Sequence, residues 1–356
     1  MLKDFVDNVA TNSHLRIERD LGDGFFKLRA SEAQRRQAKQ DIRCNEDIIV
    51  EMLRNSRDAG AKNIFVATHT QDNTRHIIII DDGGGVPKTH YETIFEPYVT
   101  SKLNTLIEDK WGVHGRGMAL YSIKLNANES RVINSGTGCG TSIYVKTIHF
   151  NEKTDQSTFP SFYVNDNSTM LVRGPKNILR IVAEFAIENR KQVNVYIGSP
   201  AEIASTIYNL SEKSDKVFSE PDEFTKLTEL LSYSSDPREF REYAAEIGLV
   251  ISERTARRIM DGEVGPQKNM LARIAEVGIS AKDNKKQINK DILDIHNPIY
   301  KKPKVKLSDE DKSELVEKVK DAFKEIGEKY YLDTDISPKL SIRKGKLNIS
   351  FDIVEI

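Results

Sequence analysis

The chain has 356 residues, of which 30% are charged and 38% hydrophobic, and its formal net charge is −1. This balance is typical of globular proteins with two or three domains, and it excludes a uniformly basic nucleic-acid coat. No apolar run is long enough to cross a bilayer or to form a signal peptide, and the two cysteines lack metal-ligand spacing. We therefore expect a cytoplasmic protein with no membrane partner.

The first segment, residues 1–44, carries a weak helical pattern that is clearest in SEAQRRQAKQDIR. Its density of arginine and lysine is typical of an exposed helix or a docking arm. We predict an N-terminal helical arm over residues 1–44.

The next segment, residues 45–61, predicts an amphipathic helix. Glu51, Asn55 and Asp58 lie four and three residues apart, so they share one face. Asn45 is a plausible cap and Gly60 a stop signal. Apolar residues recur at helical spacing on a different face, at Ile48, Ile49, Met52, Leu53 and Ala59.

Two strands are predicted next, over residues 63–69 and 75–81, with a turn between them. The second strand contains four consecutive isoleucines, which indicates burial on both faces of the sheet. It runs directly into Asp81 and a glycine-rich stretch, DDGGG. An acidic group thus sits at the edge of a buried sheet, followed by backbone that can approach a ligand closely.

A glycine cluster, GVHGRG, follows a short helix and turn over residues 91–98 and a polar segment over 103–111. The cluster opens onto a helical pattern over residues 118–125. A glycine loop at a helix start points free N–H groups at one spot, which suits phosphate. Strands over residues 131–134 and 141–146 flank a tight glycine turn.

The pattern changes after residue 150. We predict a small α/β segment over residues 151–212, with a strand, a helix and a strand. A helical domain is expected over residues 222–281 and an exposed lysine-rich linker over residues 282–306. Residues 307–356 predict a helix followed by a β-hairpin.

These residues together suit a purine nucleoside triphosphate. Asp81 can accept a hydrogen bond from an adenine amine, Asn55 offers an oxygen to Mg²⁺, and Glu51 can accept a proton from a water aimed at the γ-phosphate. The glycine loop supplies N–H groups to the phosphates, and Lys102 adds a positive charge. No Walker-type loop occurs, which excludes a P-loop ATPase.

Five motifs in this order resemble the ATP-binding module shared by gyrases, ninety-kilodalton heat-shock chaperones, histidine kinases and MutL proteins, the GHKL superfamily. They are EMLRNSRDAGA, IIDDGGGV, FEPYVTSK, GVHGRGMAL and GTGCGTSI. The resemblance covers residues 45–150 and implies an α+β fold, a two-layer α/β sandwich of the Bergerat type. It also implies ATP and Mg²⁺ as ligands.

The resemblance implies a role for each matched position. Glu51 would be the general base, Asn55 the magnesium ligand, and Asp81 the adenine contact supported by Thr141. Asp58 would be structural, and residues 99–117 would form a lid over the phosphates. The remaining expected nucleotide contacts are Gly83, Gly85, Val86, Lys102, Gly112, His114, Gly115, Arg116, Gly117 and Met118.

A second resemblance covers residues 238–279, which are similar to the helix-turn-helix of phage-repressor-like regulators. Arg254, Arg257 and Arg258 would then lie on or beside a recognition helix that contacts DNA. Two extra residues before Ser252 depart from the usual tight turn. The alternative is a small helical domain that packs against the ATPase core or a partner.

We expect an ATP-hydrolysing conformational switch that forms an ATP-dependent homodimer and acts on or near DNA. Two alternatives stay open: a histidine-kinase-like enzyme with a separate acceptor, and a DNA-binding regulator that binds nucleotide without turnover. Only about forty residues separate His14 from Asn55, too few for the phosphoacceptor hairpin of a kinase. Glu51 also favours hydrolysis. A lysine from a following domain, Lys176 or Lys191, is a further candidate for a γ-phosphate contact.

Overall fold

A computed structural model describes thirteen stretches of the chain and divides it into two compact units, Met1–His296 and Asn297–Ile356. The described residues are 17–28, 38–101, 107–109, 112–114, 117–148, 150, 155–164, 170–211, 221–281, 309–330, 333–334, 336–343 and 346–351.

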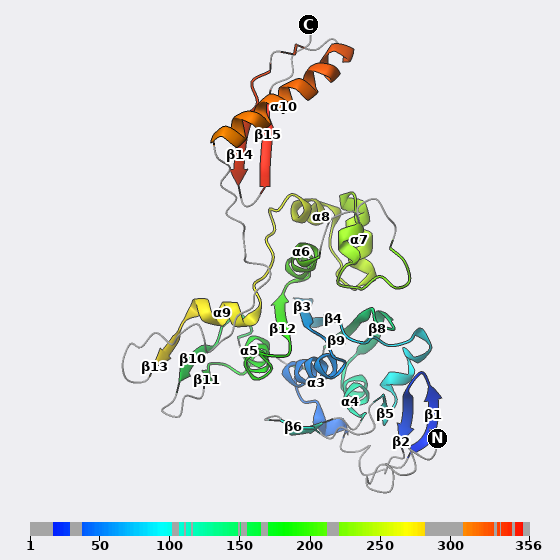
Figure 1. Cartoon of the computed structure of the whole chain (residues 1–356). Helices are drawn as coiled ribbons and strands as arrows, with labels where there is room; N and C mark the ends of the chain where they lie inside the picture. The colour runs from blue at the N-terminus through cyan, green and yellow to red at the C-terminus, as the bar shows by residue number, and fades with distance from the viewer. Residues whose placement is uncertain are drawn as a thin grey trace. The chain divides into compact units, whose positions relative to one another are not determined.

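A five-stranded sheet forms the centre of the first unit, in the order β12-β3-β4-β9-β8 (Figure 1). Its strands are β3 (Asn63–Gln71), β4 (Thr74–Asp81), β8 (Glu129–Gly136), β9 (Gly140–Thr147) and β12 (Asn194–Gly198). Neighbours are antiparallel except for β12 and β3, which are parallel. The tight β3–β4 turn is closed by Asp72 and Asn73, both with positive φ.

Helices cover one face of this sheet and complete the predicted α+β sandwich, so the predicted fold class is confirmed. They are α3 (Asn45–Asp58), α4 (Ala119–Asn126) and α5 (Ile178–Glu188). The apolar face of α3 packs on alternate sheet residues, including Ile64, Val66, Ile77 and Ile79. Asn45 is not the predicted cap: Cys44 holds that position, and the buried Asn45 side chain accepts a hydrogen bond from Thr147 at 2.7 Å.

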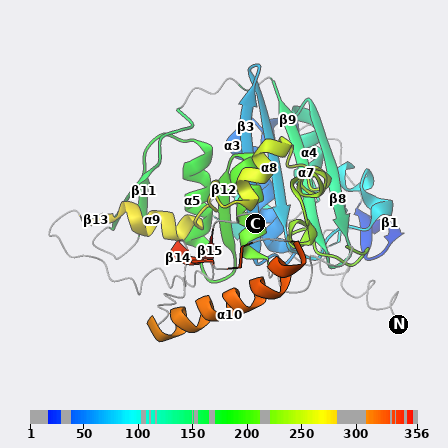
Figure 2. The ribbon, with the colours of Figure 1, turned by 90° about the horizontal axis from the view of Figure 1, so that it is seen from above.

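A second helical layer covers the opposite face (Figures 1 and 2). It contains α6 (Pro200–Leu210), η4 (Leu230–Tyr233), α7 (Pro237–Glu246) and α8 (Glu253–Met260). The hydroxyl of Ser142 on β9 donates to the carbonyl of Ile247 across 2.8 Å, and Gly248 lies against Ile78 of β4. This layer explains why all four isoleucines of β4 are at most 2% exposed, and it confirms the predicted burial on both faces.

The N-terminal segment differs from its prediction where the structure describes it. Residues 17–28 form a hairpin, β1 (Ile17–Gly22) and β2 (Phe25–Leu28), rather than part of a helical arm. β2 pairs with β5 (Val99–Thr100), so the hairpin is held by a strand far along the chain. Residues 38–41 are helical, as expected.

The predicted boundaries after residue 150 are crossed by hydrogen bonds. β12, from the predicted small α/β segment, is the edge strand of the central sheet. β13 (Ile279–Ala281), from the predicted helical domain, pairs with β10 (Ser161–Val164), which also pairs with β11 (Met170–Arg173). The helix α9 (Met270–Val277) packs against α5 and β12. The predicted division into domains stays a prediction, although these pairings join its parts.

The second unit contains α10 (Asp309–Gly327), η7 (Glu328–Tyr330), β14 (Lys339–Arg343) and β15 (Lys346–Ser350). β14 and β15 form an antiparallel hairpin, as the alternating sequence predicts. Phe323 of α10 contacts Phe351 edge-on, with ring centroids 4.9 Å apart. In the described stretches of both units, no helix has the length and apolar character needed to span a membrane.

Candidate functional site

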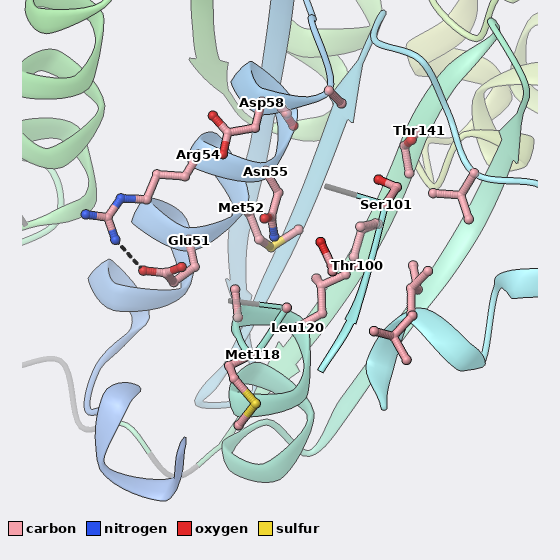
Figure 3. A pocket seen from close by; sticks show the side chains of 18 of the residues that line it. Glu51, Met52, Arg54, Asn55, Asp58, Thr100, Ser101, Met118, Leu120 and Thr141 are labelled. Carbon is pink, nitrogen blue, oxygen red and sulfur yellow. Dashed lines mark hydrogen bonds and ion pairs between the residues drawn. The ribbon is translucent and has the colours of Figure 1, made fainter. Parts of the chain in front are cut away.

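A cavity of about 1900 Å³ is lined by residues of α3, the end of β4, the first half of β9 and the start of α4. Figure 3 shows Glu51, Asn55 and Asp58 on α3 along one wall and Thr141 on the other. The predicted site residues that line the cavity are Glu51, Asn55, Asp81, Gly85, Val86, Gly117, Met118 and Thr141. The structure thus brings together the acid, amide and glycine groups of several separate motifs.

Asp81 lies buried at the end of β4, the central strand of the sheet, and is 5% exposed. One carboxylate oxygen accepts the hydroxyl of Ser56 at 2.7 Å, and the other accepts the backbone N–H of Gly83 at 2.9 Å. Burial raises the pKa of Asp81 to about 6, although these hydrogen bonds favour the charged form. Gly83 donates to Asp81 and is not among the residues that line the cavity.

The turn beside Asp81 requires glycine at position 85. Gly85 has φ +72°, and an added Cβ would lie 1.8 Å from the carbonyl oxygen of Gly136. The next amide, of Val86, donates to the hydroxyl of Ser135 at 2.7 Å, and that hydroxyl also lies 3.2 Å from the hydroxyl of Thr141. This hydrogen-bonded floor joins the glycine turn to β8 and β9.

Ser56 and Ser135 are functional neighbours that the sequence analysis missed. Ser56 follows Asn55 directly and falls inside a recognised motif, so it was detectable as a polar residue on a buried helix face. Ser135 had no such signal, because its role depends on strand pairing with Thr141.

Asn55 is the residue whose environment points most directly to a ligand outside the chain. Its side-chain amide nitrogen is buried and has no hydrogen-bond partner among the described residues. Oxygen and nitrogen of an amide exchange places by a half-turn of the side chain, so either atom can face the cavity. An unsatisfied amide on a cavity wall fits the predicted oxygen ligand of Mg²⁺.

Glu51 is held by an arginine one turn further along α3. Arg54 donates to a carboxylate oxygen of Glu51 at 2.6 Å, a contact drawn in Figure 3. Burial raises the pKa of Glu51 above its ordinary value, and the charge of Arg54 opposes that increase. A carboxylate with a raised pKa is better suited to accept a proton near neutral pH.

Asp109 is a further neighbour that the sequence analysis did not identify. Its carboxylate accepts hydrogen bonds from the Nε of Arg54, at 2.9 Å, and from the Nη2 of the same guanidinium. The guanidinium of Arg57 lies 4.0 Å from the carboxylate of Asp109 and pairs with Asp58 at 2.9 Å. Asp58, expected to be structural, therefore belongs to an ion-pair network on the cavity wall.

The predicted polar segment and glycine loop contain regular structure where they are described. β6 (Ile107–Asp109) and β7 (Gly112–His114) form an antiparallel hairpin, so Gly112 and His114 lie in a strand rather than in a loop. Gly117 keeps the expected place beside the cavity, with φ +67°. Three other predicted phosphate contacts, Lys102, Gly115 and Arg116, lie outside the described residues, as does His14.

Neither candidate lysine of the following segment reaches the cavity wall. Lys176 precedes α5 and Lys191 follows it, and the residues that line the cavity include neither. The role proposed for them from sequence has no support in the arrangement of the described chain.

The repressor-like resemblance is not confirmed. Helices form where predicted, but α7 and α8 pack against each other while α9 packs against α5 and β12. Arg254, Arg257 and Arg258 are exposed on α8, where Arg257 pairs with Glu253 at 3.7 Å and Arg258 with Glu263 at 2.9 Å. The arrangement matches the alternative interpretation, in which these helices pack on the ATPase core.

Comparison with known proteins gives matches over the part of the chain that forms the cavity. Residues 42–167 match a family model described as histidine kinase-, DNA gyrase B-, and HSP90-like ATPase. This match spans the sheet strands β3, β4, β8 and β9 and the helices α3 and α4. It therefore covers all of the cavity residues that the sequence motifs identified.

Similar curated proteins are DNA mismatch repair proteins MutL. The chain is 38% identical over 102 residues to that of Parabacteroides distasonis and 39% identical over 103 residues to that of Leptospira biflexa. Each match covers 28% of this chain and 16% of the relative. A Clostridium botulinum MutL is 41% identical over 80 residues, or 21% of this chain and 12% of the relative. The similarity thus concerns one domain of much longer proteins.

Proposed function

We propose that this chain hydrolyses ATP with Mg²⁺. The premise is that residues 42–167 form an ATPase domain of the GHKL superfamily. We further propose that the nucleotide cycle drives a conformational switch. The observation that carries this proposal is the cavity itself, in which α3 presents Glu51 and Asn55 and the end of β4 presents Asp81.

Each proposed role follows from the chemistry of the side chain. Asp81, fixed by Ser56 and Gly83, would accept the exocyclic amine of adenine. Asn55 would hold Mg²⁺, which would neutralise phosphate charge. Glu51 would accept the proton of the attacking water, and its raised pKa supports that role.

The function is tested with Glu51→Ala in the full chain. We expect the variant to bind ATP within about threefold of the native affinity and to hydrolyse it at least about a hundredfold more slowly, because only the proton acceptor is lost. Phosphate release measures turnover, and calorimetry measures binding. Full hydrolysis by Glu51→Ala would reject the assignment of the base.

The same experiment separates hydrolysis from phosphotransfer. With γ-labelled ATP, free phosphate as the product supports the ATPase. Stable label on this chain or on an added acceptor would instead support the kinase alternative.

We also propose that the chain acts on DNA and dimerises with ATP. The support is the similarity to MutL proteins, whose name describes DNA mismatch repair. Fluorescence anisotropy with duplex DNA at two salt concentrations would test the first part, since contacts to phosphates weaken steeply with salt. Light scattering with and without a non-hydrolysable ATP analogue would test the second. Absence of salt-dependent binding, or an unchanged mass, would reject the corresponding part.

A further inference from the structure

Arg54 occupies the centre of an ion-pair network on the cavity wall. Its side chain is 4% exposed, although it carries a charge that water would stabilise. The guanidinium donates to Glu51 on one side and to Asp109 on the other. A buried guanidinium needs such partners, and its rigid planar fork fixes the relative positions of both carboxylates.

The two carboxylates come from different parts of the fold. Glu51 lies on α3, whereas Asp109 is the last residue of β6 and lies opposite Gly112 of β7. The side chain of Asp109 is 13% exposed, so its contacts with α3 are made largely out of water. Arg54 is therefore a physical link between the proposed base and the β6–β7 hairpin.

The surroundings show that the link is specific. Arg57, the other guanidinium on this side of α3, lies 4.0 Å from Asp109 but pairs with Asp58 and lies over the ring of Phe185 on α5. Arg54 contacts both carboxylates directly. Asp41 adds a further negative charge near Glu51.

We propose that Arg54 is a positioning residue that couples the orientation of Glu51 to the seating of the β6–β7 hairpin through Asp109. With one oxygen of Glu51 held by Arg54, the rotamer of the carboxylate is fixed and its other oxygen is left for the water. When Asp109 is lost, Arg54 loses the carboxylate that accepts from its Nε and Nη2, and the orientation that it imposes on Glu51 is loosened. This inference rests on the proposed function, because it gives Glu51 the role of base.

The test compares Asp109→Asn with a matched control, Glu184→Gln. Glu184 on α5 also pairs with an arginine, Arg180 at 2.8 Å, and is equally buried at 14% exposure, but it does not line the cavity. We expect Asp109→Asn to lower kcat about tenfold while KM for ATP and the Kd for ADP stay within about twofold. Glu184→Gln should change none of these. Asp109→Glu, which restores the carboxylate, should recover part of the lost kcat.

A second readout tests the link without turnover. We expect hydrogen exchange without nucleotide to be faster over β6 and β7 in Asp109→Asn and in Arg54→Lys, because lysine lacks the fork that holds two carboxylates. Glu51→Gln should abolish hydrolysis but leave this exchange unchanged, since Arg54 keeps its contact with Asp109.

The outcomes separate the inference from the function it rests on. If the native chain hydrolyses ATP and Asp109→Asn has the same kcat, the coupling alone is overturned. An equal loss of kcat in Asp109→Asn and Glu184→Gln also overturns the coupling alone. Unchanged exchange in both Asp109→Asn and Arg54→Lys overturns the link between Arg54 and the hairpin. A native chain that binds ATP without hydrolysing it overturns the proposed function and the coupling together.

Discussion

Ser56 donates its hydroxyl to the carboxylate of Asp81 across 2.7 Å, and both side chains are buried. The bond joins α3, which carries the proposed base and metal ligand, to the end of β4, which carries the proposed adenine contact. Burial nevertheless raises the pKa of Asp81 to about 6. The charged form needed at neutral pH is therefore maintained at a cost in folding free energy.

The first prediction is that Asp81→Asn stabilises the fold at pH 7.5. The pKa of Asp81 in the folded chain, about 6, exceeds the ordinary value of 3.8, so the folded state holds this proton more tightly than the unfolded state. Its contribution to the free energy of unfolding is therefore fully present below pH 3.8 and is lost as the pH rises through 6. At pH 7.5 the native carboxylate costs at most about 3 kcal/mol. Thermal unfolding should show a higher Tm for the variant at pH 7.5 and a smaller difference at pH 5.

Asp82→Asn is the matched control. One carboxylate oxygen of Asp82 accepts the backbone amides of Lys62 and Asn63 at 2.6 and 2.8 Å, and the other accepts the side-chain amide of Asn63 at 2.8 Å. An asparagine cannot accept on both sides, so Asp82→Asn should lower stability by about 1–3 kcal/mol. ADP should bind Asp81→Asn more than about tenfold more weakly. A lower Tm for Asp81→Asn at pH 7.5 would contradict the assigned cost of burial.

A second prediction concerns two glycines in left-handed conformation. Gly85→Ala should abolish nucleotide binding and lower the free energy of unfolding by more than about 3 kcal/mol, because its Cβ would overlap the carbonyl oxygen of Gly136. Gly138 has a similar φ of +79°, but a Cβ added there would meet no atom within 4 Å. Gly138→Ala should therefore lower the free energy of unfolding by only about 1 kcal/mol. Chemical denaturation and ADP titration measure both effects, and equal losses would contradict the steric argument.

The parts of the fold that were predictable are those with local signals. The α3 motif, the four isoleucines of β4 and the glycine turns each encode their structure within a few residues. The helix α6 also had such a signal, a capping box from Ser199 to Glu202 with Pro200 in the first turn, which the sequence analysis overlooked.

The other differences arise from partners far along the chain. The sequences of β1, IERDLG, and β2, FFKL, do not alternate regularly between apolar and polar residues, and β2 pairs with β5. Asp109 looks like one acid in a polar segment until β6 places it beside Arg54. The arginines of α8 resemble a DNA-binding surface in sequence. The structure shows instead that α8 packs against α7 and α6.

A third prediction tests whether the second helical layer belongs to the fold of the sheet. Phe240 on α7 is fully buried and meets Tyr208 of α6 edge-on, with ring centroids 5.1 Å apart. Phe240→Ala should lower the free energy of unfolding by about 3–5 kcal/mol. Phe224 is 73% exposed, so Phe224→Ala should change it by less than about 0.5 kcal/mol. Denaturation followed by circular dichroism measures both, and a native-like Phe240→Ala would show that the layer contributes little.

The last prediction concerns the buried amide of Asn55 and its proposed metal ion. If Asn55 holds Mg²⁺, removal of the metal with EDTA should weaken ATP binding by the native chain, whereas Asn55→Ala should bind ATP weakly in both conditions. Two perturbations that remove one interaction are not additive, and this non-additivity is the signature of a direct contact. Calorimetry of the native chain and the variant, each with and without Mg²⁺, gives the four affinities. An equal effect of EDTA on both proteins would place the metal elsewhere, and the unsatisfied amide of Asn55 would then need another ligand.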